Sequence, residues 1–88
     1  MAETVLYAFT GVNATDNEFV VAPGAQVGDV IKFAVIIASS NPIIGGDATA
    51  YYEGVVPINQ KIVQRAVTVV GSTFSPEDSV VLALVERP

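Results

Sequence analysis

The chain has 88 residues, of which 51% are hydrophobic and 15% are charged, and its formal net charge is −5. This length allows one small domain, residues 1–88. The charged fraction is low, because an average soluble domain carries about 25% charged residues. Its four cationic side chains make the chain a poor partner for nucleic acid. Cysteine and histidine are both absent, which excludes disulfides, thiolate zinc sites and histidine general bases.

The predicted elements are short strands rich in valine, isoleucine, threonine and tyrosine, separated by turn signals. In chain order they are residues 4–9, 18–21, 29–38, 48–56, 61–70 and 79–86. Ser75-Pro76 resembles a helix start, so residues 79–86 could be helical instead, but their valines favour a strand. About six antiparallel strands in one domain predict an all-β fold, a small β-sandwich or barrel of jelly-roll type.

Two of these strands are apolar on both faces. Alternation in residues 29–38 places on one face Ile31, Phe33, Val35 and Ile37, and on the other Val30, Ala34 and Ile36. Residues 79–87 repeat the pattern, with Val80, Leu82 and Leu84 opposite Val81, Ala83 and Val85. A strand of a small antiparallel protein normally has one polar face. Because so short a chain cannot bury both faces, we predict a subunit that buries one against other chains, in a homo-oligomer or a larger assembly.

No apolar run reaches the ~20 residues that a membrane-spanning helix needs, so the surplus of apolar residues is not explained by a membrane. It is better explained by interfaces. Ile43 and Ile44 lie in a predicted loop between Pro42 and Gly45, where apolar side chains suit a contact with another subunit.

Tyr51 and Tyr52 are neighbours on a predicted strand, so we expect one ring inside and the other outside. Core packing with the hydroxyl in contact with water is the default interpretation of such a tyrosine. An exposed tyrosine would be an interface anchor or a platform that stacks on a sugar.

The predicted strand 61–70 carries two cations on an apolar face. The interface candidates on this strand are Lys61, Val63, Arg65, Val67 and Val69. A cation in such a position extends to solvent or pairs with a carboxylate. Glu53 and Glu86 are the candidate carboxylates, either within the chain or across a subunit interface.

The acidic residues give no catalytic pattern. Asp16, Glu18 and Asp47 could gather oxygens around calcium, but their spacing matches no calcium loop. We expect Asp29, which follows Gly28, to close its turn by accepting hydrogen bonds from nearby backbone amides. Since the sequence also has no phosphate loop and no nucleophile elbow, we predict no catalytic residue, no metal site and no cofactor, and therefore not an enzyme.

Gly24-Ala25, followed by Val27-Gly28-Asp29, forms a "GA-x-VGD" turn before a strand, and residues 67–71 and 80–85 supply alternating-valine strands near the C-terminus. In these motifs the chain resembles small β-rich structural virion proteins of tailed bacteriophages. The resemblance implies a capsid decoration (cement) protein, a head fibre or a tail-fibre tip. Such proteins are β-sandwiches or related folds, often trimers, without catalytic residues.

The composition and the resemblance together predict a structural protein on the capsid surface of a virion. In this hypothesis the chain is a decoration protein that binds neighbouring major capsid subunits or other virion subunits, as a homo-oligomer with the trimer favoured. The alternative is a receptor- or carbohydrate-binding module of a tail fibre or spike, for which Tyr51, Tyr52 and Asn59 would supply the platform. A subunit of a non-viral particle, such as a bacterial microcompartment or a secretion apparatus, also fits.

Overall fold

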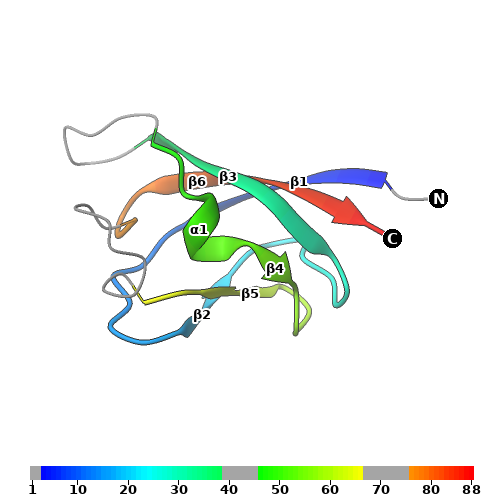
Figure 1. The fold of residues 1–88 in the computed structure, drawn as a ribbon, viewed down its shortest axis with the longest axis horizontal. Helices are drawn as coiled ribbons and strands as arrows, with labels where there is room; N and C mark the ends of the chain where they lie inside the picture. The colour runs from blue at the N-terminus through cyan, green and yellow to red at the C-terminus, as the bar shows by residue number, and fades with distance from the viewer. Residues whose placement is uncertain (1–2, 39–45, 67–75) are drawn as a thin grey trace.

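The computed structural model describes residues 3–38, 46–66 and 76–88. Its elements in chain order are β1 (Glu3–Thr10), β2 (Glu18–Val21), β3 (Val30–Ala38), α1 (Thr49–Tyr52), β4 (Gly54–Val55), β5 (Lys61–Gln64) and β6 (Val80–Arg87). The strands form two antiparallel sheets, one in the order β1-β6-β3-β4 and the other of β2 and β5 (Figure 1). The predicted small all-β fold is confirmed.

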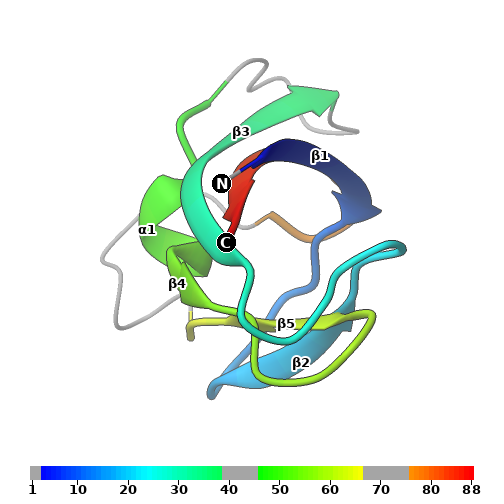
Figure 2. The same cartoon turned by 90° about the vertical axis from the view of Figure 1, so that its right-hand side faces the viewer.

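The larger sheet curls over the smaller one, and the core lies between them (Figure 2). β6 is central and pairs with β1 over eight consecutive residues, from Thr10↔Val80 to Glu3↔Arg87. Alternation on β6 is as predicted: Val81, Ala83 and Val85 are buried, and their neighbours on the strand face outward. The helical alternative for this segment is wrong.

β3 departs from simple alternation at Lys32. Ile31 pairs with Val85 and Phe33 with Leu84, so Lys32 is an extra residue in the β3 strand, a β-bulge. One extra residue exchanges the two faces of the residues that follow, here as far as a second register shift between Ile36 and Ala38. The predicted face that joined Ile31 to Phe33 is therefore wrong: Ile31 is buried, while Phe33 is 45% exposed.

The predicted strand 48–56 is the largest error. Residues Thr49–Tyr52 form a single helical turn, and strand pairing is limited to Gly54–Val55. The Asp47 carboxylate accepts hydrogen bonds from the backbone N–H and the hydroxyl of Thr49, which favours a turn over a strand at this point.

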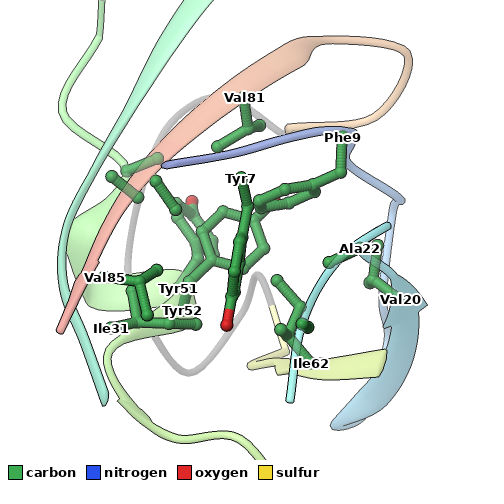
Figure 3. Packing of buried hydrophobic residues seen from close by; sticks show 14 of the residues in the cluster. Tyr7, Phe9, Val20, Ala22, Ile31, Tyr51, Tyr52, Ile62, Val81 and Val85 are labelled. Carbon is green, nitrogen blue, oxygen red and sulfur yellow. The ribbon is translucent and has the colours of Figure 1, made fainter. Parts of the chain in front are cut away.

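The helical turn decides where the two tyrosines lie. Consecutive residues point to opposite faces of a strand but only about 100° apart on a helix. Tyr51 and Tyr52 consequently both enter the core, each 2% exposed, which corrects the expectation that one ring faces outward. Figure 3 shows these two rings meeting Tyr7 and Phe9 at the centre of the core, and the Phe9 and Tyr52 rings pack edge to face at 5.0 Å.

Candidate interaction surface

Polar side chains inside the fold are held by specific partners. Asp29 is 1% exposed and accepts hydrogen bonds from the Tyr7 hydroxyl and from the Gln26 backbone N–H at 3.1 Å. Arg87 donates to both carboxylate oxygens of Asp29, from Nε and NH2, each at 2.9 Å. The predicted contact of Asp29 with its own turn is confirmed, and Tyr7 and Arg87 are partners that the sequence did not indicate.

The charges in this cluster stabilise one another. Hydrogen bonds from Arg87 are the main cause that lowers the pKa of Asp29 to about 2, and the charged Asp29 in turn raises the pKa of Arg87. Burial, with a smaller effect from Asp29, raises the pKa of Tyr7 to about 12. Near neutral pH the cluster is a carboxylate, a guanidinium and a neutral phenol, an arrangement that ties the end of β6 to the turn before β3.

Gln64 ties β5 to the β1–β2 connection and to α1 in a similar way. Its side chain is fully buried, donates to the Val12 carbonyl at 2.6 Å and accepts from the Val12 N–H at 3.1 Å. The Tyr52 hydroxyl donates to the same amide oxygen at 2.9 Å, and burial raises the pKa of this phenol. Within the described ranges, no buried side-chain polar atom is left without a hydrogen-bond partner. These groups therefore belong to the fold.

The residues predicted at an interface fall in several places. Arg65 follows β5 and is tied to α1 by hydrogen bonds to the Ala50 carbonyl at 2.8 Å and to Glu53 at 3.3 Å, so its carboxylate partner lies within the chain. Glu86, the other candidate, is paired with Lys32 at 3.9 Å. Interface candidates that lie outside the described residues are Ile43, Ile44, Val67 and Val69.

The outer face of the larger sheet is apolar across three strands. The name outer face is used here for the outward apolar residues of these strands. They are Leu6 and Ala8 of β1, Phe33, Val35 and Ile37 of β3, and Val80, Leu82 and Leu84 of β6. Leu84 lies between Leu6 and Phe33 in the register of the strands. Their exposed fractions are 41%, 59% and 45%. Exposed apolar surfaces that extend over several strands are uncommon on monomeric proteins and are typical of interaction sites.

The smaller sheet has an apolar outer side too. In the β2–β5 register, Phe19 lies opposite Val63 and Val21 opposite Lys61. Phe19 is 54% exposed and Val21 is also exposed. We call these four residues the β2–β5 face. It contains two of the predicted interface residues, Lys61 and Val63, and the exposed phenylalanine that prediction missed.

A groove separates β1 from β2. Phe9, Phe19 and Val21 contribute to its lining, and each of the two strands is at an edge of its own sheet. Edge strands carry unpaired backbone groups that accept a further strand. The groove therefore lies beside two strands that are each at the edge of a sheet.

Comparison with known proteins finds no match to a family model, a curated protein or a solved structure.

Function is therefore inferred from the surfaces of the chain itself. Among the described residues, no three histidine, cysteine, aspartate or glutamate side chains come together in a group that could hold a metal ion. The same part of the chain contains no helix that is long and apolar enough to cross a membrane. With Tyr51 and Tyr52 in the core, their rings are not at the surface to stack on a sugar, and Asn59 accepts a hydrogen bond from the Val27 N–H at 2.9 Å.

Proposed function

We propose that this chain is a structural assembly subunit, and in its specific form a decoration protein that binds the capsid of a tailed phage and bridges neighbouring capsid subunits. The observation that supports the proposal is exposed apolar surface on both sheets, at the outer face and at the β2–β5 face. The two sheets enclose the core, so these surfaces lie on different sides of the molecule (Figure 2). One copy can then contact two neighbours at once.

The mechanism needs no catalytic group. Each square ångström of apolar surface removed from water contributes about 25 cal/mol, so contacts on two sides link two neighbours by burial alone. A protein that binds the assembled lattice and not its separated subunits stabilises the lattice by mass action. Such a subunit raises the temperature at which the particle comes apart.

Purified particles give the direct test. Virions are isolated on a density gradient from a culture that produces the protein, and the ratio of this chain to the major capsid subunit is measured by quantitative mass spectrometry. The proposal predicts a fixed ratio of small whole numbers, together with a lower disassembly temperature for particles that lack the chain. Absence of the chain from intact virions would contradict it.

A pair of variants assigns the binding surface. Phe19→Glu places a charge on the β2–β5 face, and Thr15→Glu places the same charge at an exposed loop position. When each is added back to particles that lack the chain, we expect Phe19→Glu to bind at least about tenfold more weakly than Thr15→Glu. Equal binding would exclude the β2–β5 face as a capsid contact.

A further inference from the structure

We propose that the outer face of the larger sheet binds a second copy of this chain, face to face, around a two-fold axis. Residues that lie side by side on β1, β6 and β3 form two neighbouring rows on this face. The first row is Leu6, Leu84 and Phe33, and the second is Ala8, Leu82 and Val35. The proposed axis lies between the two rows and runs perpendicular to the strands. This inference names the partner of one of the two surfaces used in the proposed function. It leaves the β2–β5 face free for a different neighbour.

The shapes of the two rows are self-complementary. The first row has two leucines and a phenylalanine, and the second has a small residue, Ala8, at one end and Val35 at the other. A two-fold axis between the rows places Leu6 of one copy over Ala8 of the other, and Phe33 over Val35. Larger side chains then meet smaller ones at both ends of the rows, Leu84 meets Leu82 at the centre, and the contact is the same on both copies.

The charges allow two acidic molecules to meet here. Each copy carries a net charge of −5, so copies repel unless the surfaces that meet are neutral. The outer face is uncharged, and at its rim Lys32 and Glu86 already pair at 3.9 Å. Two carboxylates, those of Glu86 and Asp47, lie at the rim, whereas those of Asp16, Glu18 and Asp29 lie on the β1–β2 connection, on β2 and in the core.

The same axis brings opposite charges together at the rim. Asp47 lies beside β3, bridged to Val35, and Lys32 is the bulge residue opposite Leu84. The two-fold operation carries Lys32 of one copy to a point about one strand spacing, ~4.8 Å, from Asp47 of the other copy in the plane of the sheets, with about 10 Å between the facing sheets. A lysine side chain can span this separation, so Lys32 can exchange Glu86 of its own chain for Asp47 of the partner copy, which favours this orientation of the copies.

The size of the outer face suits a reversible dimer. Strands about 4.8 Å apart with a rise of about 3.3 Å per residue give a three-stranded face of roughly 15 by 25 Å. Two such faces cover roughly 750 Å² in projection, less than the ~1,200 Å² that stable interfaces bury. A contact of this size is typical of weak, reversible association rather than of a permanent dimer.

Sedimentation equilibrium over a dilution series tests the proposal. We expect a reversible monomer–dimer equilibrium for the native chain, and a dissociation constant at least about tenfold higher for Leu84→Glu. Phe19→Glu is the matched control, because it adds the same charge to the β2–β5 face and is expected to dimerise normally. A monomer at all concentrations, a trimer, or a dimer weakened by Phe19→Glu and not by Leu84→Glu would overturn the proposal.

Thiol cross-linking tests the axis without a charged substitution. Because the chain has no cysteine, Leu82→Cys and Leu84→Cys each introduce a single thiol. The axis places position 84 of one copy over position 82 of the other, whereas like positions are offset by about 7 Å along the strand. A short bismaleimide should therefore link a mixture of the two variants more efficiently than either variant alone. Equal or lower efficiency in the mixture would overturn this axis.

These experiments use the free protein, so their result does not depend on a virus particle. If dimers form with the expected pairing but the chain is absent from virions, the proposed function fails and the dimer stands. If the chain is present in virions but monomeric when free, the dimer fails and the capsid role stands.

Discussion

The two sides of the larger sheet use similar residues for different purposes. On the inner side, Val81, Ala83 and Val85 of β6 pack against the tyrosine-rich core. On the outer side, Val80 and Leu84 of the same strand are partly exposed. The residue types hardly differ, so composition alone does not show which side faces the protein's own core. The difference lies in what covers each side.

Polar groups at the two sides of the larger sheet also differ. The inner side ends in the Asp29, Tyr7 and Arg87 cluster, whose donors and acceptors are satisfied within the chain. The outer face ends in an exposed Lys32–Glu86 pair at 3.9 Å. Inner side chains therefore contribute to the free energy of unfolding of the monomer, and outer ones are expected to contribute to association.

The largest expected effect is a difference in the free energy of unfolding between substitutions at two neighbouring residues of β6. Val85→Ser should lower the free energy of unfolding by about 3 kcal/mol, because it removes buried methyl groups and buries a hydroxyl. Leu84→Ser should lower it by only about 1 kcal/mol in dilute monomer, because Leu84 is 41% exposed. Urea unfolding followed by circular dichroism measures both. Similar losses for the two variants would remove the distinction between the faces.

Removing Arg87 tests the inner cluster. Arg87→Ala leaves the buried Asp29 carboxylate without its cationic partner and should cost about 3 kcal/mol of unfolding free energy. Arg65→Ala removes an exposed pair with Glu53 and should cost less than about 1 kcal/mol. Both values come from the same urea titration, and equal costs would show that the Asp29 cluster does not stabilise the fold.

Acid should weaken the inner cluster. The pKa of Asp29 is lowered to about 2 in the folded chain, mainly by hydrogen bonds from Arg87, and an unfolded aspartate titrates near 3.9. Its contribution, about 2 kcal/mol, is present above pH ~4 and is lost as the pH falls from ~4 through ~2. Unfolding midpoints measured across this range should show the loss, and Asp29→Asn should flatten it. An unchanged acid profile in Asp29→Asn would contradict the assignment.

The smallest effect is expected for the hydrogen bond between α1 and β5. Tyr52→Phe removes the hydroxyl that donates to Gln64 and keeps the ring contact with Phe9. Because Gln64 remains bonded to Val12, we expect a loss of only about 1 kcal/mol in unfolding free energy. Thermal unfolding with and without the substitution measures it, and no change would show that the hydroxyl is not used.

Much of the sheet could be predicted from local sequence. The positions of β1, β2, β3 and β6 follow from β-branched alternation and turn residues, and the contact of Asp29 with its own turn is a local pattern. The two apolar sides of β6 were visible for the same reason. Alternation is a property of residues that are close in the sequence, so the two faces of a strand can be predicted without knowing its partner strands.

The rest depends on contacts between distant residues. Arg87 reaches Asp29 across 58 positions and Tyr7 reaches it across 22, so no local signal identifies either partner. The bulge at Lys32 follows from pairing with β6. The helical turn at 49–52 forms where Thr49 docks on Ala34 of β3, with hydrogen bonds of 3.1 and 3.3 Å. Tertiary contacts override strand propensity there.

If the outer face is covered by another copy of the chain, the stability of the folded state depends on protein concentration, and unfolding at several concentrations shows whether it does. The urea midpoint of the native chain should rise with protein concentration, because dimerisation stabilises the folded state by mass action. The midpoint of Leu84→Glu should stay constant over the same range. A native midpoint independent of concentration would contradict the account.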